Sequence, residues 1–461
     1  MPQPQNTRTS STPVSATQTS PIMASGSSSV SAALTYNGLP KTKAPMGDVT
    51  LPPIKSKGKK QAPALPCRAA KGRLLWIGDA AVPTGFATVT HSVLQHLCRE
   101  WEVIVSGVNY EGGAHPYPYH IMPARQGHGD MWGMNRFVDV CAEFAPDVVI
   151  INNDWWNVAE FLQRAPKDLP LVAYMPVDGA NLDPAVLPQL NGLAAAVWYC
   201  DFGHQEAARA GFTGQRHVVP HGMDAALWQP VEKNLARELL GLSMPQEAFI
   251  VGNVNRNQPR KRLDLSLQFF ADWVKERQIA DAYLLLHCAK RDSGWDLERL
   301  ARHHGISDRL ILTGSEDLRT APDASRVRLV YSALDVQITT TLGEGWGLTT
   351  MEGMACGVPQ IVPDWAALGE WALPALKVPC SVQMAHPEIN TIGALPDKAA
   401  FIAHLDALYR NQNLRAQLGA QSTAFVHQPC FQWSEVARQL DATLQQARHT
   451  HSMPREAAFA A

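Results

Sequence analysis

Short apolar segments alternate with segments of helical periodicity along the chain from residue 73 onward. Residues 74–77 are apolar without a break, which is typical of a strand buried on both faces. From Phe86 to Arg99, apolar residues recur at helical spacing instead. The alternation continues and predicts further strands at 102–108, 147–152, 170–175, 195–200 and 215–219. Apolar strands separated by helices indicate a parallel sheet covered on both faces.

The pattern starts again after about residue 245. It predicts strands at 249–252, 282–288, 309–313, 335–340 and 358–362. The helices predicted between and after them are 263–277, 295–304, 325–333, 347–356, 397–411 and 431–448. The predicted fold class is therefore α/β, with two doubly wound Rossmann-like domains facing an interdomain cleft. Ligands of such sheets bind beyond the carboxyl ends of the strands, so the cleft is the expected site.

The first 70 residues differ from the rest in composition. They are rich in Ser, Thr and Pro, and residues 1–73 hold ten Lys or Arg but one acidic residue, Asp48. Such a segment buries too little apolar area to offset its ordering entropy, so we expect a disordered basic tail. It is either a solvated linker or a contact to nucleic acid or another anionic surface. The remaining predicted boundaries are 71–230 for the first domain and 231–430 for the second.

Other features restrict the location of the protein. No apolar run reaches the ~20 residues that span a bilayer, and the N-terminus has no secretory pattern. The eight cysteines are scattered without a C-x-x-C pair, as in a reducing compartment. We expect a cytoplasmic protein without a membrane span. The chain also lacks an H-x-x-H motif or a carboxylate cluster, so no metal is expected. No pattern indicates the oligomeric state.

The segment 343–359 carries the most specific motif. Glu344 and Glu352 stand eight positions apart in a glycine-rich loop that leads into a helix. At ~100° per residue they fall on nearly the same helix face. Glycines let a ligand approach the backbone, and the helix N-terminus offers free N–H groups to a phosphate. Two carboxylates beside an anion site suit a sugar nucleotide. The other residues expected to contact it are Gly345, Trp346, Gly347 and Leu348.

Two more loops follow predicted strands. The first, 252–262, contains Arg256 and Lys261, which are suited to stabilise the negative charge that develops on a departing phosphate. The second, 78–86, contains Gly85, whose N–H lies at the start of a predicted helix and is a candidate phosphate contact. This loop is neither G-x-G-x-x-G nor a P-loop, so it supports neither a dinucleotide nor a nucleoside triphosphate site.

The Glu-x7-Glu motif and its Ala-Cys-Gly-Val-Pro continuation resemble family 4 retaining glycosyltransferases with the GT-B fold. The resemblance implies that Glu344 meets the donor sugar and that Glu352 binds the ribose hydroxyls. It also implies that Arg256 and Lys261, with the family's Arg-x4-Lys spacing, hold the donor diphosphate without a metal or other cofactor. Helix 431–448 would cross back to the first domain.

The first domain departs from the family pattern. Many relatives have a histidine after the strand that ends near Tyr174, whereas this chain has Asp178, which we predict to meet the acceptor or the sugar hydroxyls. A turn-capping role is the alternative. Trp155 and Trp156 follow another strand and either stack an acceptor ring or pack beneath a loop. His221 stands where the family commonly has asparagine.

The sequence thus predicts a retaining glycosyltransferase that uses a nucleotide sugar. The acceptor is a glycan, a small molecule or hydroxymethylated DNA. A GT-B epimerase, a phosphorylase and a non-catalytic nucleotide-sugar binding protein are the alternatives.

Overall fold

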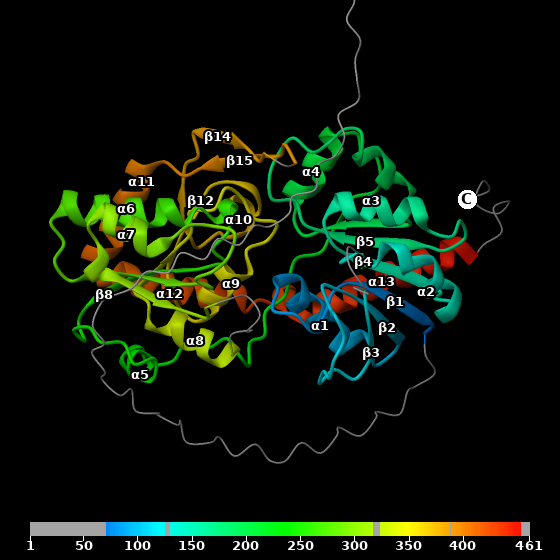
Figure 1. Cartoon of the computed structure of the whole chain (residues 1–461), viewed down its shortest axis with the longest axis horizontal. Coiled ribbons are helices and arrows are strands. Elements are labelled where there is room, and N and C mark those ends of the chain that lie inside the picture. Colours follow the sequence, from blue (N-terminus) through cyan, green and yellow to red (C-terminus); the bar gives the residue numbers. More distant parts are fainter. Residues whose placement is uncertain (1–70, 125–129, 317–322, 388, 453–461) are drawn as a thin grey trace, which may run out of the picture. The chain divides into compact units, whose positions relative to one another are not determined.

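The computed structural model describes residues 71–452, except for 125–129, 317–322 and 388 (Figure 1). The predicted disordered tail, residues 1–70, lies outside the described residues. Among the residues described, no helix is both long and apolar enough to cross a membrane. Each described cysteine is a free thiol.

The first lobe is built on a parallel sheet of seven strands. Their order is β3-β2-β1-β4-β5-β6-β7. The strands are β1 (Arg73–Asp79), β2 (Glu102–Val108), β3 (His120–Pro123), β4 (Val148–Asn152), β5 (Leu171–Met175), β6 (Ala195–Trp198) and β7 (His217–Val218). Its helices are α1 (Gly85–Leu97), α2 (Phe137–Phe144), α3 (Trp155–Arg164) and α4 (Asp201–Arg209).

The second lobe repeats this plan with six parallel strands in the order β10-β9-β8-β11-β12-β13. The strands are β8 (Phe249–Val254), β9 (Ala282–His287), β10 (Leu310–Thr313), β11 (Val336–Ile338), β12 (Gln360–Pro363) and β13 (Leu376–Val378). A separate antiparallel hairpin consists of β14 (Val382–Ala385) and β15 (Ile392–Leu395). The helices are α5 (Lys233–Leu239), α6 (Leu263–Arg277), α7 (Leu297–His304), α8 (Ala324–Ala333), α9 (Leu348–Ala355), α10 (Ala366–Trp371), α11 (Lys398–Arg410) and α12 (Gln412–Val426).

Helices cover both faces of each sheet, because successive strand residues point to opposite sides. In β1, Leu74 and Trp76 belong to one apolar cluster, whereas Leu75 and Ile77 belong to another. The predicted class of two doubly wound α/β domains is confirmed.

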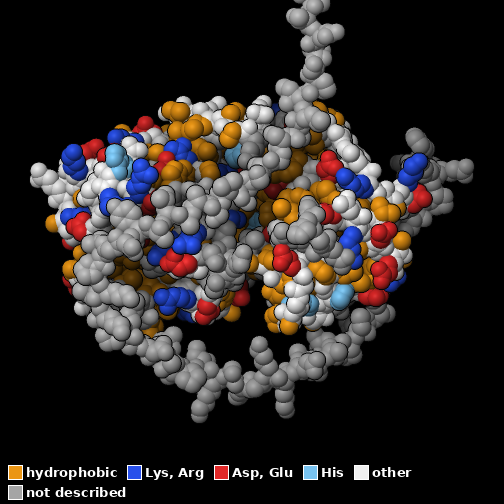
Figure 2. Space-filling view, viewed as in Figure 1, with side chains coloured by type: hydrophobic (Ala, Val, Ile, Leu, Met, Phe, Trp, Pro, Cys, Tyr) orange, Lys and Arg blue, Asp and Glu red, His pale blue; other side chains and the backbone are white. Residues whose placement is uncertain are grey.

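The last helix, α13 (Trp433–Ser452), packs against α1, β4 and β5 of the first lobe. Its buried residues Val436 and Leu440 share a core cluster with Ile250 of the second sheet. The two lobes are therefore joined by one continuous apolar core on this side. On the face shown in Figure 2, acidic and basic side chains are interspersed over both lobes.

Both sheets reverse their strand order beside the first strand of the lobe, between β1 and β4 and between β8 and β11. Loops at such a switch point diverge to opposite faces of the sheet and leave a crevice beyond the carboxyl ends. The chain places Thr84, Asp154, Arg256 and Glu344 in the loops that follow these four strands. The fold thus brings the candidate site residues to facing edges.

Candidate active site

A cavity of about 650 Å³ lies between the strand-end loops of the two lobes. The loops after β1, β4 and β5 form one wall, the loops after β8 and β11 form the other, and the β14–β15 hairpin contributes as well. The structure brings together here every residue predicted to contact the donor or the acceptor, except Glu352 and Trp155. Those lining the cavity are Gly85, Asp178, Arg256, Lys261, Glu344, Gly345, Trp346, Gly347 and Leu348.

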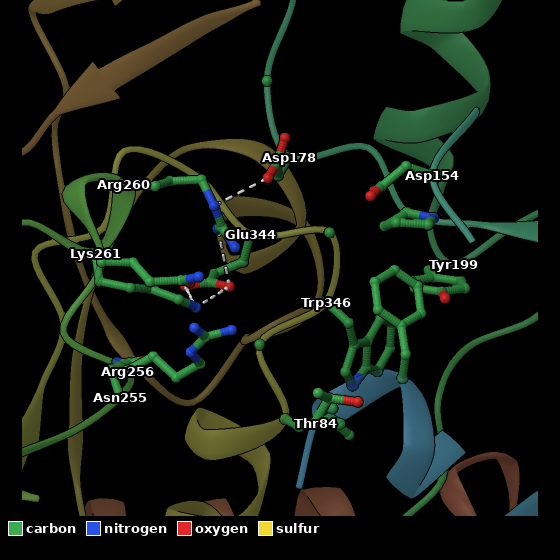
Figure 3. Close-up of a pocket in the computed structure, with 18 of the residues that line it drawn as sticks. Thr84, Asp154, Asp178, Tyr199, Asn255, Arg256, Arg260, Lys261, Glu344 and Trp346 are labelled. Carbon is green, nitrogen blue, oxygen red and sulfur yellow. Dashed lines mark hydrogen bonds and ion pairs between the residues drawn. The ribbon is translucent and has the colours of Figure 1, made fainter. Parts of the chain in front are cut away.

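Glu344 is the centre of an ionic network (Figure 3). The Lys261 ammonium donates to both of its carboxylate oxygens, with Nζ 2.6 Å from Oε1 and 2.7 Å from Oε2. Arg260 approaches Oε2 with its Nη1 at 3.3 Å and reaches across the cleft to Asp178, with Nε 3.1 Å from Oδ2. One guanidinium therefore links carboxylates of both lobes. An ammonium has three N–H donors, so Lys261 keeps one for a ligand.

The network fixes the charges of its members. Burial by itself would raise the pKa of Glu344, but Lys261 and Arg260 outweigh it and bring the pKa down to about 2. Burial lowers the pKa of Lys261 to about 8, because the attraction of Glu344 offsets desolvation only in part. At neutral pH both groups are ionised. The cations are thus held in place before any ligand arrives, as electrostatic stabilisation of a developing charge requires.

Arg256 is oriented by an acidic partner of its own. Its Nε and Nη2 lie 3.0 Å from the two carboxylate oxygens of Asp292. This bidentate pair uses two of the five guanidinium N–H donors, so the others stay available to a ligand. The neighbouring Arg262 is different: it pairs with Asp264 at 2.8 Å and is not among the cavity-lining residues. Arg260 also lines the cavity, although the Arg-x4-Lys spacing did not point to it.

Two glycines of the motif allow the lobes to touch, because they have no Cβ. A Cβ on Gly343 would lie 1.8 Å from the carbonyl oxygen of Asp178, and one on Gly345 would lie 2.4 Å from Cβ of Pro176. Both glycines therefore let the loop after β11 touch the loop after β5. Gly347 is the N-cap residue of α9, with φ at +95° in the left-handed region that favours glycine.

Glu352 lies outside the cavity. It belongs to α9 and is not among the residues lining the cavity, where the α9 contribution comes from Leu348 and Thr349. Its Oε2 accepts a hydrogen bond from the Tyr331 hydroxyl at 2.8 Å. Burial raises the pKa of Glu352 to about 7, against the opposing effect of that hydrogen bond. Glu352 thus sits about one helical turn beyond the cavity wall.

The N-termini of α1 and α9 both lie at the cavity and are close to each other. A Cβ on Gly85, at the start of α1, would lie 3.6 Å from Cδ1 of Leu348, at the start of α9. Thr84 caps α1, since its hydroxyl oxygen accepts from the Ala87 N–H at 3.1 Å and its hydroxyl donates to Asp79 at 2.6 Å. The free N–H groups of both helices favour anions here.

The first lobe adds residues that sequence reasoning did not select. Asp79 and Asp154 line the cavity together with Asp178. Burial, reinforced by the charge of Asp178 and opposed by Arg260, raises the pKa of Asp154 to about 7. The signal that could have found both residues is their place directly after β1 and β4, at the ends that the fold turns toward the cleft.

His221 also lines the cavity, within a shell of aromatic rings. It is 2% exposed and packs against Tyr199, with 4.0 Å between ring centroids, and against Trp346 and Trp433. Burial lowers its pKa to about 3, so the ring is neutral at physiological pH. Of the adjacent tryptophans weighed from the sequence, Trp156 lines the cavity and Trp155 is buried in the core.

Residues 245–408 match the family model described as glycosyl transferases group 1. The D-inositol 3-phosphate glycosyltransferase of Streptosporangium roseum is 32% identical over 149 residues, which are 32% of this chain and 33% of that protein. A protein of the same name from Streptomyces bingchenggensis is 28% identical over 223 residues, 48% of this chain and 45% of that protein. The chain spans about a third of the length of the first curated relatives.

Solved structures match more of the chain. Sucrose-phosphate synthase from Thermosynechococcus elongatus aligns with 83% of this chain and 100% of its own, with TM-score 0.65 and 19% identity. Anabaena HepE in complex with UDP and glucose aligns with 81% and 99%, with TM-score 0.59 and 15% identity. The fold is GT-B. The second lobe, which contains the family match, holds the cationic loop and Glu344.

Proposed function

We propose that this protein is a retaining glycosyltransferase that moves a sugar from a nucleotide-sugar donor to an acceptor hydroxyl. The observation that carries the proposal is that Arg256 and the network of Arg260, Lys261 and Glu344 line the second-lobe wall of a GT-B cleft. Support comes from the glycosyltransferases among the relatives, and from a neighbour in fold that was solved with UDP and glucose.

In the proposed complex, the donor diphosphate lies against Arg256, Lys261 and the N-terminus of α9. The cations stabilise the charge that develops on the leaving β-phosphate, a role that preorganised donors fill at no reorganisation cost. Cationic side chains and helix dipoles would serve in place of a metal. Among the described residues, no group of three or more His, Cys, Asp or Glu is arranged to hold a metal ion.

Glu344 would orient the donor sugar, since its carboxylate is fixed and ionised at the cavity wall. The nucleoside would extend along α9, so that its ribose hydroxyls reach Glu352 one turn beyond the cavity. In the transfer, the bond between the anomeric carbon and the phosphate oxygen breaks, and a bond from that carbon to the acceptor oxygen forms on the same face. The proton of the acceptor hydroxyl passes to the departing phosphate.

Donor turnover is the direct test. Incubation with a panel of nucleotide sugars should release a nucleoside diphosphate from at least one of them. NMR of the product should give the same anomeric configuration as the donor. Product with the opposite configuration would contradict a retaining mechanism, and no turnover of any donor would contradict the function.

The alternatives predict different products. An epimerase converts the donor without an external acceptor, and a phosphorylase requires phosphate. A binding protein retains donor affinity without turnover. Transfer to hydroxymethylated DNA is favoured by one observation, the aromatic Trp156 at the cavity. It is tested by repeating the assay with such DNA. The cytoplasmic location stays a prediction from the sequence.

A further inference from the structure

The cavity wall contributed by the first lobe is acidic. Asp79, Asp154 and Asp178 are the acidic side chains that the described part of this lobe brings to the cavity, and its His221 is neutral. The cations at the cavity all come from the loop after β8, in the second lobe. The two lobes therefore contribute different groups to the cleft. The cations lie on the second-lobe wall and the three acidic side chains lie on the first-lobe wall, as Figure 3 shows for Arg256 and Asp154.

The three carboxylates differ in their partners. Asp79 accepts hydrogen bonds from the Thr84 hydroxyl at 2.6 Å and from Asn109 Nδ2 at 3.0 Å. Asp178 is paired with Arg260 at 3.1 Å. For the carboxylate of Asp154, the described residues provide neither a hydrogen bond nor an ion pair. Asp154 is half-buried at the cavity wall, so its carboxyl group is available to accept a hydrogen bond from a ligand hydroxyl.

A second group without a partner lines the same cavity. His221 is 2% exposed, and its Nδ1 has no hydrogen-bond partner among the described residues. Because the ring is neutral, it offers a polar contact without attracting an anion. Both groups can thus hydrogen-bond a ligand hydroxyl, and the carboxyl group of Asp154 disfavours a phosphate at this wall.

Aromatic rings complete this wall. Trp132 and Trp156 are half-buried and line the cavity, and Trp156 is braced edge-on by Trp155, with 5.0 Å between ring centroids. Flat aromatic faces stack on sugar rings and on nucleobases. The wall thus combines a stacking surface with an available carboxylate.

We infer that the acceptor is an uncharged, hydroxyl-bearing ring that stacks on Trp132 and Trp156 and offers its reacting hydroxyl to Asp154. The inference rests on the proposed function and specifies its substrate class. Asp154 positions the hydroxyl, and the proton still leaves with the nucleoside diphosphate. A phosphorylated acceptor, such as the one in the name of the D-inositol 3-phosphate relatives, would bring a dianion to three carboxylates.

Matched acceptor pairs test this inference once a donor is known. The pairs are myo-inositol and its 3-phosphate, fructose and its 6-phosphate, glucose and its 6-phosphate, and 5-hydroxymethyldeoxycytidine and its 5′-monophosphate. We expect kcat/KM to favour the uncharged member of a used pair by at least about ten-fold. The sugar and nucleoside pairs distinguish a polyol acceptor from a hydroxymethylated base. Mass spectrometry of the products identifies the acceptor.

Asp154→Asn should lower transfer to the uncharged member by about ten-fold or more and reduce the discrimination against its phosphate ester by a similar factor. A merely structural role would not change that ratio. Asp168→Asn, which removes an exposed carboxylate of the same lobe away from the cavity, should change neither quantity.

Preference for a phosphorylated member, or an unchanged ratio in Asp154→Asn, overturns the inference. Donor hydrolysis without transfer to any member of the panel also overturns it, but leaves the proposed function standing. Absence of donor turnover would contradict both this inference and the proposed function.

Discussion

The two walls of the cleft are organised in opposite ways. On the second-lobe wall, each cation has a carboxylate partner: Lys261 and Arg260 hold Glu344, and Asp292 holds Arg256. On the first-lobe wall, Asp154 and His221 have polar atoms without partners among the described residues. A preorganised wall suits the charge that develops on a diphosphate, which is common to all nucleotide-sugar donors. In the proposed function, an acceptor hydroxyl would complete the first-lobe wall, so we expect this wall to set the acceptor specificity.

The largest expected effect is on the preorganised wall. Lys261→Ala removes one fixed cation and should lower donor turnover about 10²- to 10³-fold, as the loss of a preorganised donor costs ~2.7–4 kcal/mol of barrier. This loss is measured as a lower rate of nucleoside diphosphate release. Arg262→Ala is the matched control, because that cation pairs with Asp264 outside the cavity. Equal losses in both variants would mean that the loop acts through its overall charge.

The contact between the walls is tested at a glycine. In Gly343→Ala, the new Cβ would collide with the carbonyl oxygen of Asp178, so the two loops must separate. A displacement of ~1 Å costs up to about 10²-fold in rate, and we expect a loss of that order in steady-state transfer. Gly192→Ala is the control, since its Cβ would meet only the side chain of Leu162, at 3.3 Å. Wild-type transfer by Gly343→Ala would show that the contact is dispensable.

Glu352 tests how far the donor site extends beyond the cavity. Glu352→Ala should reduce kcat/KM for the donor by about ten-fold, the equivalent of ~1.4 kcal/mol, through the loss of a ribose contact. Tyr331→Phe keeps the carboxylate and removes its hydrogen-bond donor, so its effect should be smaller. If Tyr331→Phe is as damaging as Glu352→Ala, the pair has a structural role.

The smallest effect concerns pH. The pKa of Lys261 is lowered to about 8, so this base loses its proton above that pH. The kcat/KM for the donor should therefore fall above pH 8 and be down about ten-fold at pH 9. In Lys261→Arg the decline should move to higher pH, because a guanidinium stays protonated. An alkaline decline that is unchanged in this variant would have to come from another group.

Much of the second-lobe wall could be predicted from the sequence. The apolar pattern identified the strands, and the helix expected over 263–277 is α6 with those bounds. Arg256, Lys261 and Glu344 follow predicted strands, and parallel strands bring such residues to one edge. Other elements gave no signal: β14 is exposed along its whole length, and α12 buries Gly419 and Ser422 on its inner face. Neither has the apolar periodicity by which elements are recognised.

What the sequence determined by itself was the local chemistry: which strands are buried, which loops follow them, and which acids and cations stand in those loops. These depend on residues near one another in the chain. Only the tertiary structure decided that Arg260 joins Asp178 to Glu344 and that Gly343 and Gly345 touch the opposite lobe. It also decided that the carboxyl group of Asp154 has no side-chain partner among the described residues. Such facts depend on how the two lobes meet, and no spacing along the chain encodes the distance between their loops.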